Sequence, residues 1–239
     1  MTVLITGGSR GIGLGIAREF SARGDLVILN AKSDYVQLAT SVLELRKTGT
    51  HAAGYLADLS SHAEARDMFA KIEADYGPVD VLVNNAGAAY YGLFSDMSDD
   101  DIQGVLADNL LSTINTTHHA VPTMVRAKGG CIINITSIWG IQGASCEVVY
   151  SAAKAGVIGF TKALARELGP SGVRVNAIAC GAFDTRMNDA LSSEDRAAFI
   201  DEIPLGRFGE VREVGKLAVY LAGAEYITGQ VVPICGGVV

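Results

Sequence analysis

Short apolar runs alternate with helical segments along the whole chain, and this alternation limits the fold more than any other feature of the sequence. The runs are rich in β-branched side chains and bounded by Gly, Asp, Asn or Ser, as expected of buried strands. They cover residues 3–6, 26–30, 52–57, 79–85, 131–136, 173–179 and 230–234. Segments with helical periodicity separate them, so each strand connects to the next through a helical crossover. The pattern predicts an α/β fold with a doubly wound, seven-stranded parallel sheet flanked by helices.

Length and charge narrow the class of protein further. At 239 residues, 49% of them hydrophobic, the chain can bury one large core, and we expect a single domain over residues 1–239. A net charge of -7 leaves no basic surplus for nucleic acid. No apolar run approaches the roughly 18 residues of a membrane span, which favours a cytoplasmic protein without a membrane partner. The cysteines lack metal-ligand spacing, so we expect packing thiols and no metal site.

The first strand leads directly into the glycine-rich stretch TGGSRGIG at residues 6–13. Its glycines allow a tight turn, a close approach of the backbone to a pyrophosphate, and close packing of the next helix. That helix offers free N–H groups and the positive end of its dipole to phosphates. Strand, loop and helix in this order predict a Rossmann-type dinucleotide site, with a structural turn as the alternative. We assign to it Gly7, Ser9, Arg10, Gly11, Ile12 and Gly13.

The residues after the second strand indicate which nicotinamide cofactor would bind. An acidic side chain at this position would bind the adenosine ribose and repel a 2'-phosphate. The sequence has Asn30 and Lys32 there and no acid. Lys32, helped by Arg10, could meet the extra phosphate through charge-assisted hydrogen bonds. We therefore expect NADPH, and the alternative is that Lys32 is a solvated surface lysine.

Polar clusters also follow the third and fourth strands. Asp58 and Leu59 follow the third strand, where Asp58 could contact an adenine edge. Asn85, Ala86 and Gly87 follow the fourth, where small residues let the chain pass close to a ribose. We expect all five to border the cofactor. Each cluster could equally be a turn, because Asn, Asp and Gly favour turns by themselves.

Tyr150 and Lys154 lie four residues apart in the stretch VVYSAAK. This spacing places them on one helical face, about one turn apart. A neighbouring ammonium and a positive nicotinamide ring would favour the phenolate and lower the tyrosine pKa, which suits proton transfer to or from a carbonyl oxygen. Ser137, at the end of the fifth strand, can hydrogen-bond the same oxygen. A Tyr–Lys pair alone would usually be coincidence, so the hypothesis depends on the glycine loop and Ser137 occurring with it.

In this combination the sequence resembles the short-chain dehydrogenase/reductase superfamily over essentially its whole length. The matching stretches, in order, are TGGSRGIG, NNAG, DNLLS, NITS, YSAAK and ITGQVVPICGG. The resemblance implies a catalytic tetrad of Asn109, Ser137, Tyr150 and Lys154. It gives Tyr150 the proton transfer, Ser137 the orientation of the carbonyl, and Lys154 the nicotinamide ribose and the tyrosine pKa. It also gives Asn109 a water that relays protons to the lysine.

The resemblance extends to the end of the sixth strand, with one departure. Gly181, Phe183 and Thr185 match positions that border the nicotinamide carboxamide, so we count them among the cofactor-binding residues. The family usually has proline before that glycine, and this chain has Cys180. The segment over residues 182–207 is expected to form a substrate lid. Its apolar wall would consist of Phe183, Met187, Leu191, Phe199, Ile203 and Leu205.

Within the superfamily the sequence is most similar to bacterial 3-oxoacyl-carrier-protein reductases. This implies a small-molecule or carrier-bound ketone as substrate and a homotetramer or homodimer, with the helices that carry Asn109 and Tyr150 at one interface. The pattern WGxxGASCExxYS also resembles reductases of a 5-aminopentanone modification on elongation factor P. Arg126 and Lys128, before the fifth strand, are the basic residues available to dock an acidic carrier. A non-catalytic NADP-binding protein is the alternative from another class.

Overall fold

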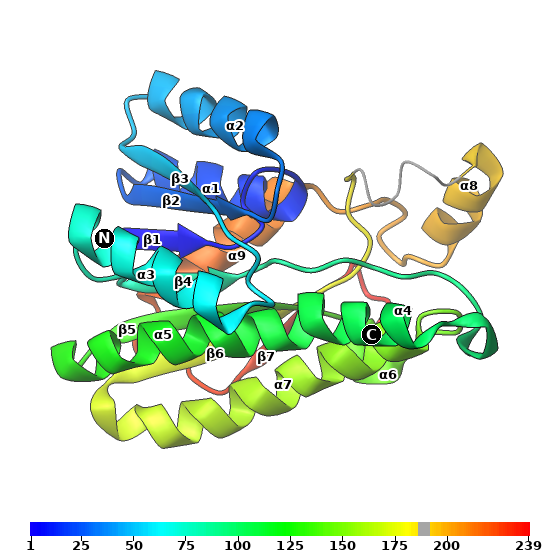
Figure 1. Cartoon of the computed structure of the whole chain (residues 1–239). Coiled ribbons are helices and arrows are strands. Elements are labelled where there is room, and N and C mark those ends of the chain that lie inside the picture. Colours follow the sequence, from blue (N-terminus) through cyan, green and yellow to red (C-terminus); the bar gives the residue numbers. More distant parts are fainter. Residues whose placement is uncertain (186–191) are drawn as a thin grey trace.

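The computed structural model describes residues 1–185 and 192–239 and contains a seven-stranded parallel sheet in the order β3-β2-β1-β4-β5-β6-β7 (Figure 1). This confirms the predicted α/β architecture and all seven predicted strands, whose ends shift by one or two residues. The strands are β1 Thr2–Ile5, β2 Leu26–Ala31, β3 Ala52–Leu56, β4 Val81–Asn84, β5 Gly130–Ser137, β6 Val173–Cys180 and β7 Val231–Ile234. Both faces of the sheet are covered, which explains why the central strands read as continuous apolar runs.

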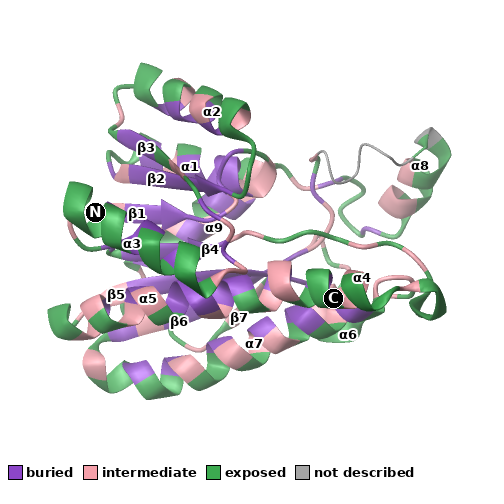
Figure 2. Cartoon of the chain, in the orientation of Figure 1, coloured by how far each residue is buried: buried purple, intermediate pink, exposed green. Residues whose placement is uncertain are grey.

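Six long helices cover the sheet in two layers, each with its own core (Figure 1). α1 (Gly11–Ala22), α2 (Tyr35–Lys47) and α9 (Val211–Gly223) pack on one face, around Phe20, Leu29 and Ile133. The other face carries the second layer and core. Its helices are α3 (His62–Tyr76), α5 (Ser112–Ala127) and α7 (Val148–Leu168), and its core includes Leu4, Phe69 and Ile132. Figure 2 shows the buried residues concentrated along the strands and the inner sides of these helices.

Several short elements lie at the carboxyl ends of the strands, where ligands bind in sheets of this kind. Figure 1 shows α4 (Asp99–Leu106), α6 (Trp139–Gln142) and α8 (Ser193–Asp201) gathered at that end. η1 (Phe94–Asp96) precedes α4, and the π-helical turn η2 (Ala107–Leu111) joins α4 to α5. The remaining short element, η3 (Gly169–Ser171), precedes β6. Within the described part of the chain, no helix is both long and apolar enough to cross a membrane.

Two asparagines in the middle of the sheet tie the central strands to the helices behind them. Asn84 Nδ2 donates to Asn134 Oδ1 and to Thr117 Oγ1, each at 2.9 Å. Thr116 donates to Asn84 Oδ1 at 2.6 Å, and Asn134 Nδ2 donates to Thr161 Oγ1 at 2.9 Å. All five side chains are buried. The network gives every one of these buried polar groups a hydrogen-bond partner, and burial without a partner would destabilise the fold. It also fixes α5 and α7 relative to β4 and β5.

Replacing Asn134 with alanine should lower the free energy of unfolding by about 2 kcal/mol, because buried partners on β4 and α7 lose their hydrogen bonds. Urea unfolding would measure the loss. Thr123→Ala is the matched control, since its hydroxyl bonds Glu73 on the exposed side of α5, and it should change stability by less than about 0.5 kcal/mol. Equal losses for the two variants would show that the buried network adds no stability beyond a surface hydrogen bond.

Candidate active site and cofactor site

The glycine loop between β1 and α1 has the backbone that the sequence predicts. Gly7 and Gly11 adopt φ values of 58° and 54°, in the left-handed region that favours glycine. A Cβ at Gly13 would lie 2.5 Å from the Gly7 carbonyl oxygen and 2.6 Å from Asn85 Nδ2, so no larger residue fits there without displacement. The loop therefore packs closely against the start of α1, with the first turn of the helix directed at the carboxyl edge of the sheet.

Neighbouring polar side chains hold this loop in place. Thr6 Oγ1 accepts hydrogen bonds from the backbone N–H groups of Asn85 and Ala86, both at 2.9 Å. Asn85 Nδ2 donates back to the carbonyl oxygens of Thr6 at 3.0 Å and Gly7 at 3.1 Å. Asn30 is buried, its backbone carbonyl accepts from the Gly8 N–H at 3.0 Å, and its amide donates to carbonyls near the end of β3. Asn30 and Asn85 therefore stabilise the glycine loop through hydrogen bonds, in addition to lying beside it.

The far side of the loop is anchored by α2. The Ser9 carbonyl oxygen accepts from Ser41 Oγ at 2.7 Å and from Gln37 Nε2 at 3.2 Å. Ser9 is buried, whereas Arg10 is exposed. Sequence reasoning missed Ser41, Gln37 and Thr6. Of these three residues, only Thr6 could have been identified from the sequence, because its hydroxyl lies at the junction of the strand and the glycine loop.

Lys32 lies between two carboxylates. Its Nζ is 3.1 Å from Asp58 Oδ2 and 3.0 Å from Asp108 Oδ1. The hydrogen bond to Asp108 is the main reason why the pKa of Lys32 is raised, and burial only partly opposes it. Asp58 also accepts from the backbone and hydroxyl of Ser60, at 3.0 and 2.7 Å. Lys32 is therefore an exposed lysine that is paired with two acids, and it would have to share or exchange Asp108 to meet a phosphate.

Ser137, Tyr150 and Lys154 come together where β5 ends and α7 begins. Ser137 lies close enough to Tyr150 to lower its pKa slightly, and Lys154 Nζ lies 5.6 Å from the centre of the Tyr150 ring. Lys154 also donates to the Ile135 carbonyl oxygen at 3.3 Å, and its side chain is buried. The helical spacing of four and the end of the fifth strand therefore bring together the three groups that the sequence singled out.

Burial dominates the pKa of Tyr150 in the protein alone. It raises the pKa of the phenol well above the ordinary value of 10.0, with further increases from the charges of Glu147 and of ionised Cys180 and a small decrease from Ser137. Burial also lowers the pKa of Lys154 to about 8. Loss of water around both groups disfavours each charged form. The lowered tyrosine pKa expected from the sequence requires the positive nicotinamide ring as well as the ammonium, so it stays a prediction for the protein with oxidised cofactor.

Asn109 lies in the π-helical turn η2 and is completely buried. Its Nδ2 donates to the carbonyl oxygens of Ala88 at 2.7 Å and Val105 at 2.9 Å. Its Oδ1 has no hydrogen-bond partner among the described residues. A Cβ at Gly87 would lie 2.5 Å from this oxygen and 3.3 Å from Lys154 Nζ, so the amide and the ammonium sit side by side beneath Gly87. A buried acceptor without a partner is an expected place for a bound water.

The residues after β6 face the same edge. Cys180 is buried and pairs in register with Ser137 of β5 and Ile234 of β7. The backbone N–H of Gly181 donates to the Ile234 carbonyl at 2.9 Å, and a Cβ at Gly181 would lie 2.8 Å from Cys235. Thr185 lies beside the glycine loop, because a Cβ at Gly11 would be 3.6 Å from its methyl carbon. Thr185 thus borders the glycine loop, and Gly181 lies against the end of β7.

The predicted lid lies partly outside the described residues. Met187 and Leu191 fall there, so the apolar wall is not complete in the structure. Phe183 and Ile203 are buried, and Phe183 bridges to Gly209. The Phe199 ring stands edge-on to Phe208, with 5.5 Å between centroids. Leu205 is 68% exposed and lines a small pocket together with Phe183.

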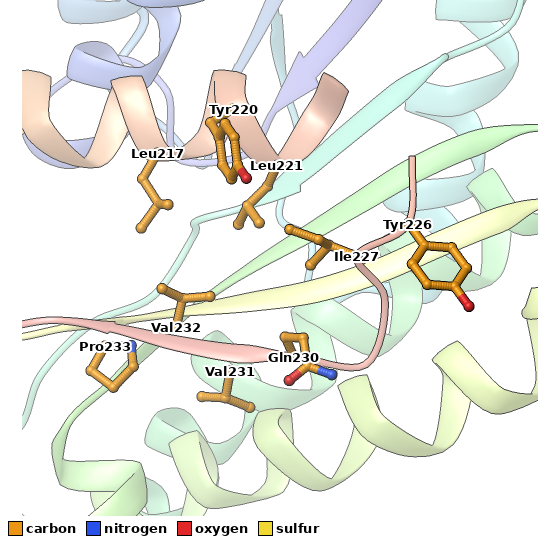
Figure 3. Close-up of a pocket in the computed structure, with 9 residues that line it drawn as sticks. All are labelled: Leu217, Tyr220, Leu221, Tyr226, Ile227, Gln230, Val231, Val232 and Pro233. Carbon is orange, nitrogen blue, oxygen red and sulfur yellow. The ribbon is translucent and has the colours of Figure 1, made fainter. Parts of the chain in front are cut away.

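A separate apolar groove lies between α9 and the edge strand β7, away from these groups. Figure 3 shows its side chains projecting from both elements and from the loop between them. They are Leu217, Tyr220, Leu221, Tyr226, Ile227, Gln230, Val231, Val232 and Pro233. None of the predicted site residues lines the groove, so it is not the place for the chemistry. No group of three or more metal-binding side chains occurs in the described ranges, 1–185 and 192–239.

Gly13→Ala should weaken cofactor binding by at least about tenfold, because the added methyl group displaces the Gly7 carbonyl and the Asn85 amide. Quenching of the single tryptophan, Trp139, during a titration with NADPH would give the affinity. Gly104→Ala is the control, since a Cβ there, inside α4, meets no described atom within 4 Å. Unchanged affinity in Gly13→Ala would mean that the loop does not hold the cofactor.

Comparison with known proteins supports the assignment made from the residues. Residues 1–196 match the short chain dehydrogenase family. The 3-oxoacyl-(acyl-carrier-protein) reductase FabG of Chlamydia trachomatis serovar D is 39% identical, over 99% of this chain and 96% of that protein. The uncharacterized oxidoreductase YmfI of Bacillus subtilis strain 168 is 38% identical, over 99% of this chain and 98% of that protein.

A solved structure gives the same result in three dimensions. A phenylalanine-to-tryptophan variant of actinorhodin polyketide ketoreductase with NADPH aligns with a TM-score of 0.95 and 36% identity, over 99% of this chain and 96% of that chain. The resemblance stated from the motifs is thus confirmed across the whole fold. The chain is an oxidoreductase that uses a nicotinamide cofactor and belongs to the short-chain dehydrogenase/reductase family.

Proposed function

We propose that this protein is an NADPH-dependent reductase that converts a ketone into a secondary alcohol, with a 3-oxoacyl thioester as the first candidate substrate. The observation that carries the proposal is the convergence of Ser137, Tyr150, Lys154 and Asn109 beside the glycine loop. A proton donor, an orienting hydroxyl and a buried cation at one point suit the reduction of a carbonyl group.

The loop and the strand ends fit a dinucleotide. Gly7, Gly11 and Gly13 leave room for a pyrophosphate against the start of α1, and Asp58, Asn85 and Gly87 line the route from adenine toward nicotinamide. Gly181 and Thr185 would border the carboxamide, and Lys154 the ribose. When bound, NADPH supplies a hydride at the nicotinamide ring. We propose NADPH over NADH because β2 ends in Asn30 and Ala31 without an acid, and Lys32 follows directly as a cation.

The protonation states support Tyr150 as the acid. Because the pKa of Tyr150 is raised, the phenol carries its proton at neutral pH, which is the form that a carbonyl reduction requires. Ser137 acts on the pKa of Tyr150, and its hydroxyl would orient the carbonyl oxygen toward that proton. Lys154, with a pKa of about 8, can return a proton to the tyrosine. The free Oδ1 of Asn109 lies beside Lys154 and would hold the water that reprotonates it.

The choice of ketone depends on where a carrier could dock. The name of the Chlamydia relative supports a 3-oxoacyl group on an acyl carrier protein. Arg126 and Lys128, however, lie before the amino end of β5, and Ser137 lies at its carboxyl end, about 23 Å away for seven strand residues. In one protomer these basic residues do not border the active site. A ketone outside the acyl-carrier class, such as the 5-aminopentanone modification on elongation factor P, is therefore the second candidate.

We also propose that the protein forms a homotetramer or homodimer in which α5 and α7 form one interface. Gly156 of α7 packs against Leu110 of η2, so the two helices already share a continuous surface within one chain.

With a 3-oxoacyl thioester and NADPH, Tyr150→Phe should lower kcat by about a thousandfold or more, because the phenol hydroxyl is the proton donor. The affinity for NADPH should change little, since the ring remains. Absorbance of NADPH follows the rate, and Tyr55→Phe, on the exposed end of β3, is the control. If Tyr150→Phe keeps wild-type turnover, another group donates the proton.

Lys32→Ala should reduce the preference for NADPH over NADH by about tenfold, because a charge-assisted contact to the 2'-phosphate is lost. The ratio of kcat/KM for the two cofactors measures it. Lys47→Ala, an exposed lysine in the last turn of α2, should leave the ratio as it is in the wild type. An unchanged ratio in Lys32→Ala would mean that Asp58 and Asp108 retain the lysine when the cofactor binds.

A further inference from the structure

Asp108 is an acidic side chain that contacts the adenosine end of the cofactor site from a distant part of the chain. It lies in the π-helical turn η2 (Ala107–Leu111), directly before Asn109. Its Oδ1 accepts a hydrogen bond from Lys32 Nζ at 3.0 Å, across 76 positions in the sequence. Lys32 is the first residue after β2 (Leu26–Ala31), where the sequence predicts the contact with a 2'-phosphate. The Asp108 carboxylate therefore binds the cation that NADPH would need.

The two acids beside Lys32 are held in different ways. Asp58 Oδ2 lies 3.1 Å from Lys32 Nζ, and Asp58 Oδ1 accepts from the backbone N–H of Ser60 at 3.0 Å and from its hydroxyl at 2.7 Å. Across residues 1–185 and 192–239, Lys32 is the only hydrogen-bond or ion-pair partner of the Asp108 carboxylate. Asp58 therefore keeps its place without the lysine, whereas the position of the Asp108 carboxylate depends on Lys32.

The charges around Lys32 oppose the arrival of another anion. One ammonium group lies between two carboxylates, so the three side chains together carry an excess of negative charge. A phosphate monoester adds a further charge of about -1.5 to -2 at pH 7. A 2'-phosphate that approached Lys32 would therefore be repelled by both carboxylates unless one of them moved away from the lysine.

Of the two acids, Asp108 is the one that can be exchanged. Its side chain is 31% exposed, so its carboxylate can return to water when the lysine binds another anion. No buried, unpaired charge would result from that exchange. Asp58, in contrast, would also have to break its two hydrogen bonds to Ser60. The contacts thus make Asp108 the direct competitor of a 2'-phosphate.

We propose that Asp108 is a specificity-determining residue that competes with the 2'-phosphate of NADPH for Lys32 and so weakens the binding of NADPH but not of NADH. This inference rests on the proposed cofactor site, and it names a residue that sets the cofactor preference there. NADH carries a 2'-hydroxyl group and leaves the pair of Lys32 and Asp108 intact. NADPH must exchange that pair for its own contact, and the exchange reduces the preference that Lys32 creates.

The test measures the binding of NADPH and NADH to the full chain by calorimetric titration, which needs no ketone. Asp108→Asn keeps the shape of the side chain and removes its charge. The dissociation constant of NADPH should fall by about tenfold in this variant, and that of NADH should change by less than about twofold. Asp108→Ala should give the same shift, because the carboxylate has no partner besides Lys32 among the described residues.

Asp100→Asn is the matched control, because it removes the same charge from an exposed position in the first turn of α4. It should keep the wild-type ratio of the two dissociation constants. A second comparison separates competition for Lys32 from simple repulsion of the phosphate. In a Lys32→Ala background, Asp108→Asn should improve NADPH binding by less than about threefold, because no lysine remains for which the two anions compete.

Three results would overturn the proposal. The first is NADPH binding that is unchanged or weaker in Asp108→Asn, since Asp108 would then be neutral or would position Lys32 for the phosphate. The second is an equal gain for NADPH and NADH, which would show a general effect of charge. The third is a full tenfold gain in the Lys32→Ala background, which would show that Asp108 repels the phosphate directly.

The binding result is independent of the proposed ketone reduction. If no ketone is reduced but the ratio of dissociation constants shifts as predicted, the inference about Asp108 stands and the proposed reaction fails. If ketones are reduced with NADPH and Asp108→Asn keeps the wild-type ratio, the proposed reaction stands and the inference is wrong. If neither nucleotide binds to any variant, both are wrong.

Discussion

The exclusion of water from Tyr150 and Lys154 is the constraint on which the rest of the site depends. Both groups lie at the carboxyl edge of a sheet whose two faces are covered by helices, so neither charged form is well solvated. Burial moves the two pKa values in opposite directions, toward a neutral phenol and a readily deprotonated ammonium. The fold thus stabilises the protonated tyrosine before any substrate arrives. The Ser137 hydroxyl and the Asn109 Oδ1, which has no partner among the described residues, lie around this pair.

The same edge is held rigid by polar side chains that do not touch a substrate. Thr6 and Asn85 join the glycine loop to the end of β4, and Ser41 joins it to α2. Gly87 then brings the chain over Asn109 and Lys154 with no space for a side chain. Because these contacts are shared, the cofactor loop and the proton-transfer groups form one unit. A substitution in the glycine loop is therefore expected to alter the positions of the proton-transfer groups, and a substitution in those groups is expected to alter the loop.

The fold and the main site groups could be predicted because their signals are local. Strand runs have the period and boundaries of buried strands, and a spacing of four fixes Tyr150 beside Lys154 on any helix. Features that depend on tertiary contacts could not be predicted. The partner of Lys32, Asp108, is 76 residues away in sequence. Asn109 was expected only from the family resemblance, because the π-helical turn in which it lies has no signature in residue spacing. The raised pKa of Tyr150 in the protein alone could not be predicted either, because burial cannot be read from the spacing of two residues.

The most direct test of this account is the ionisation of Tyr150 with and without oxidised cofactor. Ultraviolet difference spectra of wild type and Tyr150→Phe, titrated with base, isolate the phenolate signal of this residue. The account predicts a pKa above the ordinary value of 10.0 in the protein alone and a clear decrease when NADP+ adds its positive ring beside the phenol. An ordinary pKa without cofactor, or no change when NADP+ binds, would contradict it.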